Sequence, residues 1–214
     1  MTAVNIFGSA KHNTIVMVTD TASYDDAGFV RGFASKVRPV PEWSAAITGR
    51  GNSFGIDVAT RELINRGGSF KELFAITSQE LPLIVDQHRL DRPFELILTS
   101  FVAGRPAIFF IRTPGGNDSL GNGWPPYLFY PVGGSLIGPS APGFIEPDPD
   151  DAPEVIAAKL EQIIKEQRQI LAEDGYPRVG GSAELTVITP DRIEQRTLHT
   201  WCEDRIGFRM SPES

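Results

Sequence analysis

The sequence predicts an α+β protein in which layers of antiparallel sheet lie between helices. Four short β-rich runs come first, with no helical stretch between them. We expect them to pair antiparallel, because a parallel pair needs a crossover of a dozen residues or more. Two helical stretches then follow one another directly, and a third lies nearer the C-terminal end. Helices that arrive in blocks rather than alternating with strands argue against a doubly wound parallel sheet.

The first half of the chain supplies four strands and two helices. A helix is expected over about 53–65, because its apolar residues recur at helical spacing. A second is expected over 69–90, opening with the capping-box pattern Ser69-Phe70-Lys71-Glu72. Pro82 should kink this second helix or end its first half, because its ring displaces a backbone hydrogen bond. The expected strands are Thr2–Phe7, Thr14–Asp20, Lys36–Val40 and Trp43–Thr48.

The second half holds an apolar hairpin, long loops, one helix and two final strands. The hairpin should be buried on both faces, because its strands are dense in Ile, Leu, Phe and Val. Residues 113–126 and 133–150 are rich in Gly and Pro and are expected to be loops. An amphipathic helix should run from an Asp151 cap to about Glu173. The expected strands are Phe94–Val102, Pro106–Arg112, Tyr127–Val132, Ala183–Thr189 and Arg192–Trp201.

Length and composition indicate an ordinary globular protein. The 214 residues suit one domain, 1–214, with a polar tail from about 203. The 41% hydrophobic and 22% charged fractions are typical, and the apolar runs are far shorter than the ~20 residues of a membrane span. Most of the net charge of −7 lies in 146–174, so no basic face for nucleic acid is expected. The lone Cys202 cannot form an internal disulfide, and no signal peptide is visible. We expect a cytoplasmic protein with no membrane partner.

Thr2 is the first candidate for chemistry. It follows the initiator Met1, and its side chain is small enough for Met1 to be removed. Removal would leave a free α-amino group, with a reference pKa of about 7.7–8.0, beside the Thr2 hydroxyl. Such a pair can act as base and nucleophile in one residue. Most proteins that begin Met-Thr are not enzymes, so Thr2 needs support from other residues.

That support comes from an acid, a base and a glycine further along the chain. Asp20 closes the second expected strand, Lys36 follows sixteen residues later, and Gly49 thirteen after that. The chain has only five lysines, so a lysine at one specified offset is an uncommon coincidence. The pattern resembles the proteasome β-subunit family of N-terminal-nucleophile (Ntn) hydrolases, including its simpler bacterial members. The resemblance extends through the two helices to the apolar hairpin.

The resemblance implies both a fold and a site. The fold would be a four-layer αββα sandwich of the Ntn-hydrolase type, with the helices 53–65 and 69–90 on one side and 151–173 on the other. Thr2 would be the nucleophile, Lys36 would lower the proton affinity of its hydroxyl and amine, and Asp20 would orient Lys36. The Gly49 amide would stabilise the oxyanion. The substrate would be a peptide or another amide, no cofactor would be needed, and copies of the chain would assemble into a ring or stacked rings.

A catalytically silent member of the same fold is the alternative. Asp20 would then only end a strand, Lys36 would be a solvated edge lysine and Gly49 a turn residue. Such a chain would serve as a structural or assembly subunit.

Gly51-Asn52-Ser53-Phe54-Gly55 offers a different enzyme class. It is a G-x-S-x-G motif between a strand and a helix, the context of a nucleophile elbow, and Asp174 or Asp191 followed by His199 would complete a triad. An α/β-hydrolase needs a parallel sheet, however, and four helix-free strands precede this motif. We therefore expect Ser53 to cap the helix instead.

No metal or nucleotide motif is visible in the sequence. The histidines His12, His88 and His199 lack metal-ligand spacing, and the acidic run 146–151 is interrupted by two prolines, which is typical of an extended, solvated lead-in to a helix.

The two long loops favour self-association. They carry apolar side chains that either form a subunit interface or fold back over the sheet. These residues are Trp124, Tyr127, Leu136, Ile137 and Phe144.

Overall fold

Two five-stranded sheets form the centre of the molecule. The computed structural model describes residues 3–115, 123–141 and 143–210. One sheet has the order β10-β1-β2-β11-β12, and every pair in it is antiparallel. Its strands are β1 (Val4–Ser9), β2 (Thr14–Asp20), β10 (Ser135–Gly138), β11 (Ser182–Ile188) and β12 (Ile193–Thr200). We call it the β2 sheet.

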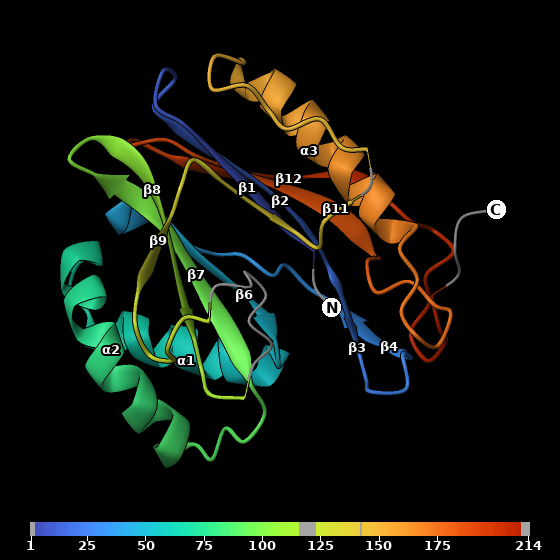
Figure 1. Cartoon of the computed structure of the whole chain (residues 1–214), viewed down its shortest axis with the longest axis horizontal. Helices are drawn as coiled ribbons and strands as arrows, with labels where there is room; N and C mark the ends of the chain where they lie inside the picture. Colours follow the sequence, from blue (N-terminus) through green and yellow to red (C-terminus); the bar gives the residue numbers. More distant parts are fainter. Residues whose placement is uncertain (1–2, 116–122, 142, 211–214) are drawn as a thin grey trace.

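The second sheet, called the β7 sheet, has the order β5-β6-β7-β8-β9 and is also antiparallel throughout. Its strands are β5 (Arg38–Val40), β6 (Ala45–Gly51), β7 (Phe94–Val102), β8 (Arg105–Arg112) and β9 (Tyr130–Val132). A two-stranded hairpin, β3 (Ala22–Tyr24) with β4 (Val30–Phe33), continues from the end of β2 (Figure 1). A 3-10 turn, η1 (Pro41–Trp43), joins β5 to β6.

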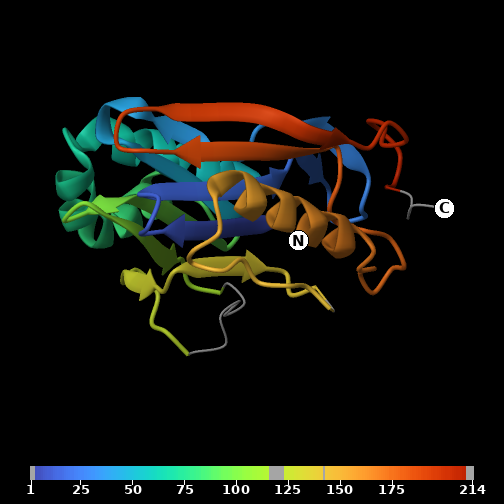
Figure 2. The same cartoon turned by 90° about the horizontal axis from the view of Figure 1, so that it is seen from above.

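Three helices cover the outer faces of the sheets. The helices α1 (Ser53–Arg66) and α2 (Phe70–Gln87) pack on the β7 sheet, and α3 (Pro153–Arg168) packs on the β2 sheet (Figures 1 and 2). In the described part of the chain, no helix is long and apolar enough to cross a membrane.

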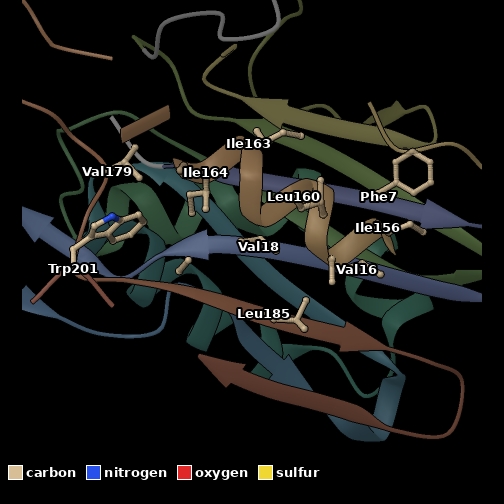
Figure 3. Close-up of a cluster of buried hydrophobic side chains, with 13 residues drawn as sticks. Phe7, Val16, Val18, Ile156, Leu160, Ile163, Ile164, Val179, Leu185 and Trp201 are labelled. Carbon is tan, nitrogen blue, oxygen red and sulfur yellow. The ribbon is translucent and has the colours of Figure 1, made fainter. Parts of the chain in front are cut away.

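The alternating direction of side chains along β2 explains how one sheet contributes to two hydrophobic clusters. Val16 and Val18 face α3 and belong to the cluster shown in Figure 3, whereas Ile15 and Met17 point to the other face. Successive side chains of a strand point to opposite faces, so every residue of β2 is buried. The second face meets the β7 sheet through side chains that include Ile97. The α1–α2 pair closes a third cluster on the far side of that sheet.

The prediction of a four-layer αββα sandwich of the Ntn-hydrolase type is wrong in that specific form. The described residues hold three helices, and α3 alone covers the β2 sheet. The extra hairpin β3–β4 is no part of the predicted layers. The described residues of 133–150 add strand β10 and irregular chain rather than a further helix, because Gly and Pro recur there. The fold is a mixed, sheet-rich one whose sheets are antiparallel, and the antiparallel pairing is confirmed.

Several element boundaries match the sequence prediction and others do not. The strands Thr14–Asp20 and Phe94–Val102 are confirmed residue for residue. Helix α2 runs through Pro82, so the proline does not end it. Helix α3 ends at Arg168 rather than near Glu173.

The predicted helix caps are partly wrong. Asp151 does not cap α3, whose N-cap is Ala152; the Asp151 carboxylate instead accepts hydrogen bonds from Asp148 N and Lys159 Nζ. The Ser69 cap of α2 is confirmed, since its hydroxyl oxygen accepts from Glu72 N at 3.2 Å.

Candidate functional site

Asp20 lies at the end of β2 with its side chain fully buried. One carboxylate oxygen, Oδ1, accepts from Lys36 Nζ at 2.7 Å and from the backbone N–H of Ala3 at 3.0 Å. The other, Oδ2, accepts a longer bond from the N–H of Gly180 at 3.4 Å. Asp20 therefore joins the start of the chain, the Lys36 segment and the turn before β11 at one carboxylate.

Lys36 lies in the segment between β4 and β5. Its side chain is 17% exposed and forms the ion pair with Asp20. Its backbone carbonyl accepts from the Thr48 hydroxyl at 2.8 Å, which ties the segment to β6. The structure thus brings Asp20 and Lys36 together, the contact that the resemblance implied.

Burial shifts the protonation of this pair. Desolvation lowers the pKa of the Lys36 ammonium below 10.5, and the neighbouring Asp20 carboxylate opposes that shift. Desolvation likewise raises the pKa of Asp20 above 3.8, against the charge of Lys36 and the three N–H donors. For both groups burial opposes the charged form, and the ion pair opposes the effect of burial.

Gly49 sits on β6 where only a glycine fits. A Cβ built at this position would lie 2.3 Å from the carbonyl oxygen of Glu95 and 3.0 Å from the Ile56 side chain. Strand β5 pairs with β6 only through Ala45–Ile47, so within the described ranges the β5 side of Thr48–Gly51 has no partner strand. That stretch of β6 borders a cavity.

The cavity has a volume of about 460 Å³ and is lined by two of the candidate residues. Lys36 and Gly49 both line it, and apolar walls come from side chains such as Ile47. An exposed ion pair between Arg38 and Asp57, 3.2 Å apart, lies at its edge. The full lining is Thr21, Ser23, Ala34, Ser35, Lys36, Val37, Arg38, Pro39, Ile47, Gly49, Gly51, Ser53, Ile56, Asp57 and Thr60.

Thr2, the predicted nucleophile, lies outside the described residues. The residue after it, Ala3, is fully buried and donates to Asp20. The described chain therefore starts at the Asp20–Lys36 pair.

The alternative serine site is not assembled. Ser53 is the first residue of α1, but the N-cap is Asn52, whose Oδ1 accepts from Phe54 N at 3.1 Å, so the prediction that Ser53 caps the helix is wrong. His199 lies on β12, in the other sheet, with its ring against Trp201. Asp174 forms an ion pair with Arg178. Across the described ranges, no group of three or more His, Cys, Asp or Glu side chains could hold a metal ion.

Sequence reasoning missed one part of the site, the Val179–Gly181 turn before β11. Gly180 donates its N–H to Asp20, and its carbonyl accepts from Thr21 N and Ala22 N at 3.2 and 3.0 Å. Gly181 has φ +76, a conformation that favours glycine. The Gly-Gly pair is the signal in the sequence that could have identified this turn.

No protein-family description and no curated protein matches the chain at the sequence level. Solved structures do match. One is Anbu (ancestral beta-subunit) from Yersinia bercovieri, with a TM-score of 0.66, 9% identity and coverage of 91% of this chain and 87% of that one. Another is an Anbu (Gly-1) mutant from Hyphomicrobium sp. strain MC1, with a TM-score of 0.65, 12% identity and coverage of 95% and 89%. The chain thus shares the overall fold of these Anbu structures.

The identification of the chain as a divergent bacterial-type member of the proteasome β-subunit family is wrong as a statement about sequence family. At 9% and 12% identity, likeness to the Anbu structures is likeness of fold alone. A fold hosts many activities, so the function has to be argued from the site.

Proposed function

We propose that this chain is an amide-bond hydrolase whose nucleophile is the Thr2 hydroxyl, exposed with a free α-amino group when Met1 is removed. One observation carries the proposal. Lys36 lines a cavity together with Gly49 and is ion-paired to the fully buried Asp20, and the same Asp20 carboxylate binds the N–H of Ala3, the residue that follows Thr2. A buried charge pair with shifted pKa values beside a cavity is typical of a catalytic site.

In the first step, the Thr2 oxygen attacks the carbonyl carbon of the amide. The α-amino group takes the hydroxyl proton, helped by the positive charge of Lys36, which lowers the proton affinity of the hydroxyl. A C–O bond forms and the carbonyl π pair moves to oxygen, where the Gly49 N–H stabilises the negative charge. Collapse of this intermediate breaks the C–N bond. The leaving amine takes the proton from the α-ammonium group, and an ester on Thr2 remains.

Water completes the reaction. It attacks the ester carbonyl, its proton passes to the α-amino group, and the C–O bond to Thr2 breaks. The Thr2 oxygen recovers a proton and the product leaves as a carboxylic acid. The net reaction is amide plus water to acid plus amine, and no cofactor takes part.

A mass-spectrometric experiment tests this proposal. The purified protein is first weighed intact to establish whether Met1 is absent, and is then treated with the p-nitrophenyl ester of a short N-acylated peptide. Wild-type protein should acquire one acyl group on its N-terminal peptide and release one equivalent of p-nitrophenol in a burst.

Two variants sharpen that experiment. Thr2→Ala keeps the free amine but removes the hydroxyl, so the burst should disappear. Ser53→Ala removes a hydroxyl that lines the same cavity and should leave the burst intact. A burst that survives Thr2→Ala and is lost in Ser53→Ala would overturn the proposal in favour of a serine nucleophile. Retention of Met1 on all molecules isolated from native cells would instead assign the chain a silent, structural role.

We also propose that the chain forms a homo-oligomer. The predicted anchors do not support this, because Leu136 is buried and the rest of that set packs against the cores, Ile137 and Phe144 under α3. Other large apolar side chains are exposed instead, among them Phe54 at 64% and Ile145 at 74%. Exposed apolar area of this kind is typical of subunit contacts. Light scattering should give a mass several times 23.4 kDa, and a monodisperse species at 23.4 kDa would refute the proposal.

A further inference from the structure

We infer that the buried Arg168–Asp204 pair is a positioning unit for the candidate site, holding the Val179–Gly181 turn against Asp20. The inference rests on the proposed function for its catalytic consequence. The structural claim, that the pair holds the hydrogen bond from Ala3 N–H to Asp20 in place, can be tested without an activity assay.

The pair itself is fully buried and bidentate. Arg168, at the end of α3, and Asp204, after β12, have side chains with no solvent exposure. Arg168 Nη1 donates to Asp204 Oδ2 at 2.9 Å and Nη2 donates to Oδ1 at 2.8 Å. The guanidinium also lies over the ring of Trp201, 4.9 Å from its centroid. A two-pronged contact of this kind fixes orientation as well as distance.

The same two side chains hold both sides of the turn. Arg168 Nη1 donates to the carbonyl oxygen of Val179 at 2.7 Å, and Asp204 Oδ2 accepts from the N–H of Gly181 at 2.6 Å. Gly180 lies between these two anchors. A Cβ on Gly180 would meet Asp204 Oδ2 at 2.4 Å and Arg168 Nη1 at 2.7 Å, so the turn is in close contact with the pair.

The Val179–Gly181 turn also contacts the end of β2. Gly180 offers its N–H to Asp20 and its carbonyl to the N–H groups of Thr21 and Ala22. The Thr21 hydroxyl accepts from Ser182 N at 2.9 Å. These bonds fix the backbone that carries Asp20, and Asp20 fixes Lys36 and Ala3. In Figure 3, Val179 and Trp201 lie at the end of the cluster near Ile164, where α3 approaches this turn.

Stability alone does not account for the pair. Removing two charges from water is costly, and replacing a buried ion pair by apolar residues of similar volume is often neutral or stabilising. The bonds to Val179 and Gly181 converge on one turn, and through it on Asp20, whereas Arg168 Nη2 also donates to Glu203 Oε1 at 3.0 Å. The convergence on the turn indicates a geometric role. Arg168 does not touch the cavity, so it is a positioning residue rather than a catalytic one.

The test uses the full-length protein and compares three variants. Arg168→Met leaves Asp204 without its charged partner. Arg168→Met/Asp204→Leu removes both charges, so this variant does not bury an unpaired charge that could prevent folding. Gln167→Met is the matched control. Gln167 is an equally buried polar side chain one position earlier on α3, but it bonds to Asn5 and the Pro139 carbonyl rather than to the turn.

Two measurements are made on each variant. Hydrogen exchange reports the protection of the Ala3, Gly180 and Gly181 N–H groups, and the p-nitrophenol burst reports the acylation of Thr2. In both Arg168 variants we expect exchange at these amides to accelerate at least tenfold. We expect the burst rate constant to fall about 10²-fold, the scale associated with a displacement of about 1 Å, with the half-saturating ester concentration unchanged. The Gln167 variant should match wild type in both.

The outcomes separate the two proposals. Normal protection of Ala3 and Gly180 in the double variant overturns the positioning role, whatever the burst shows. A wild-type protein that gives no burst refutes the proposed function, and the exchange measurement then decides the positioning role by itself. An equal loss of protection in Gln167→Met would also overturn it, because the effect would then be a general loosening around α3.

Discussion

The face beneath α1 and α2 and the region at the end of α3 are both deeply buried, but they are built from different chemistry. Under α1 and α2 the buried side chains are mostly apolar, with Leu63, Leu81 and Ile84 among them, and none is charged on either helix. At the end of α3, burial extends to charged side chains, Arg168 and Asp204, and continues to Asp20. Apolar contacts are non-directional, whereas ion pairs and hydrogen bonds fix angles and distances. The first region supports the sheet, and the second determines where particular atoms lie.

The largest expected effect comes from breaking the polar region. Arg168→Met should lower the free energy of unfolding by about 4 kcal/mol, because it leaves the buried Asp204 carboxylate without a charged partner. Arg168→Met/Asp204→Leu should recover most of that loss. Urea denaturation followed by circular dichroism measures both. Equal stability of the single and double variants would contradict the assignment of the loss to an unpaired charge.

A slightly smaller loss is expected in the apolar region. Leu81→Ala deletes a fully buried side chain of α2 and should cost about 3 kcal/mol in the same urea measurement. It should leave the exchange rate of Ala3 N–H at its wild-type value, since no polar contact of the site is changed. Faster exchange at Ala3 in this variant would show that the two regions are coupled.

The cap of α1 should contribute less again. Asn52→Ala removes the side-chain oxygen that accepts from Phe54 N and should cost about 1 kcal/mol. Ser53→Ala, one position later, makes no cap and should cost no more than a few tenths of that, measured by the same denaturation. A larger loss for Ser53→Ala would restore Ser53 as the capping residue.

The smallest expected effect comes from a change of pH alone. Burial lowers the pKa of the Lys36 ammonium, so its charge is lost at a pH below 10.5. The burst rate should therefore rise with pH while the α-amine loses its proton, and then fall as Lys36 becomes neutral. Lys36→Arg keeps its charge throughout this range, so any activity it retains should lack the alkaline fall. Rapid-mixing assays between pH 6 and about 10 would record both profiles; an alkaline fall that persists in Lys36→Arg would have to be assigned to another group.

Local patterns in the sequence were enough to predict most of the strands and both helices of the α1–α2 pair. The hairpin β3–β4 was missed, because its strands are only three and four residues long and carry no clear alternation. Strand β10 was missed for a related reason, since it lies in a Gly- and Pro-rich stretch and forms only through pairing with β1.

The candidate residues of the site could be predicted from the sequence, but the residues that position them could not. Asp20, Lys36 and Gly49 could be proposed from offsets along the chain, and the structure brings them to one cavity wall or next to it. Arg168 could not, because its amphipathic helix places charged residues at many positions and its partner Asp204 is far away in sequence. Burial of a charge depends on a tertiary contact that local periodicity does not contain.

Strand β12 has a consequence for how the protein behaves at high concentration. Within the described residues it pairs only with β11, so one row of its backbone N–H and C=O groups is open along eight residues. Open edges of this length are templates for the growth of intermolecular sheets. The exposed Glu194 and Arg196 interrupt this edge with charge, a device that natural sheets use against fibrillar aggregation. Neutralising both side chains should therefore shorten the lag time of fibril formation without altering the folded chain.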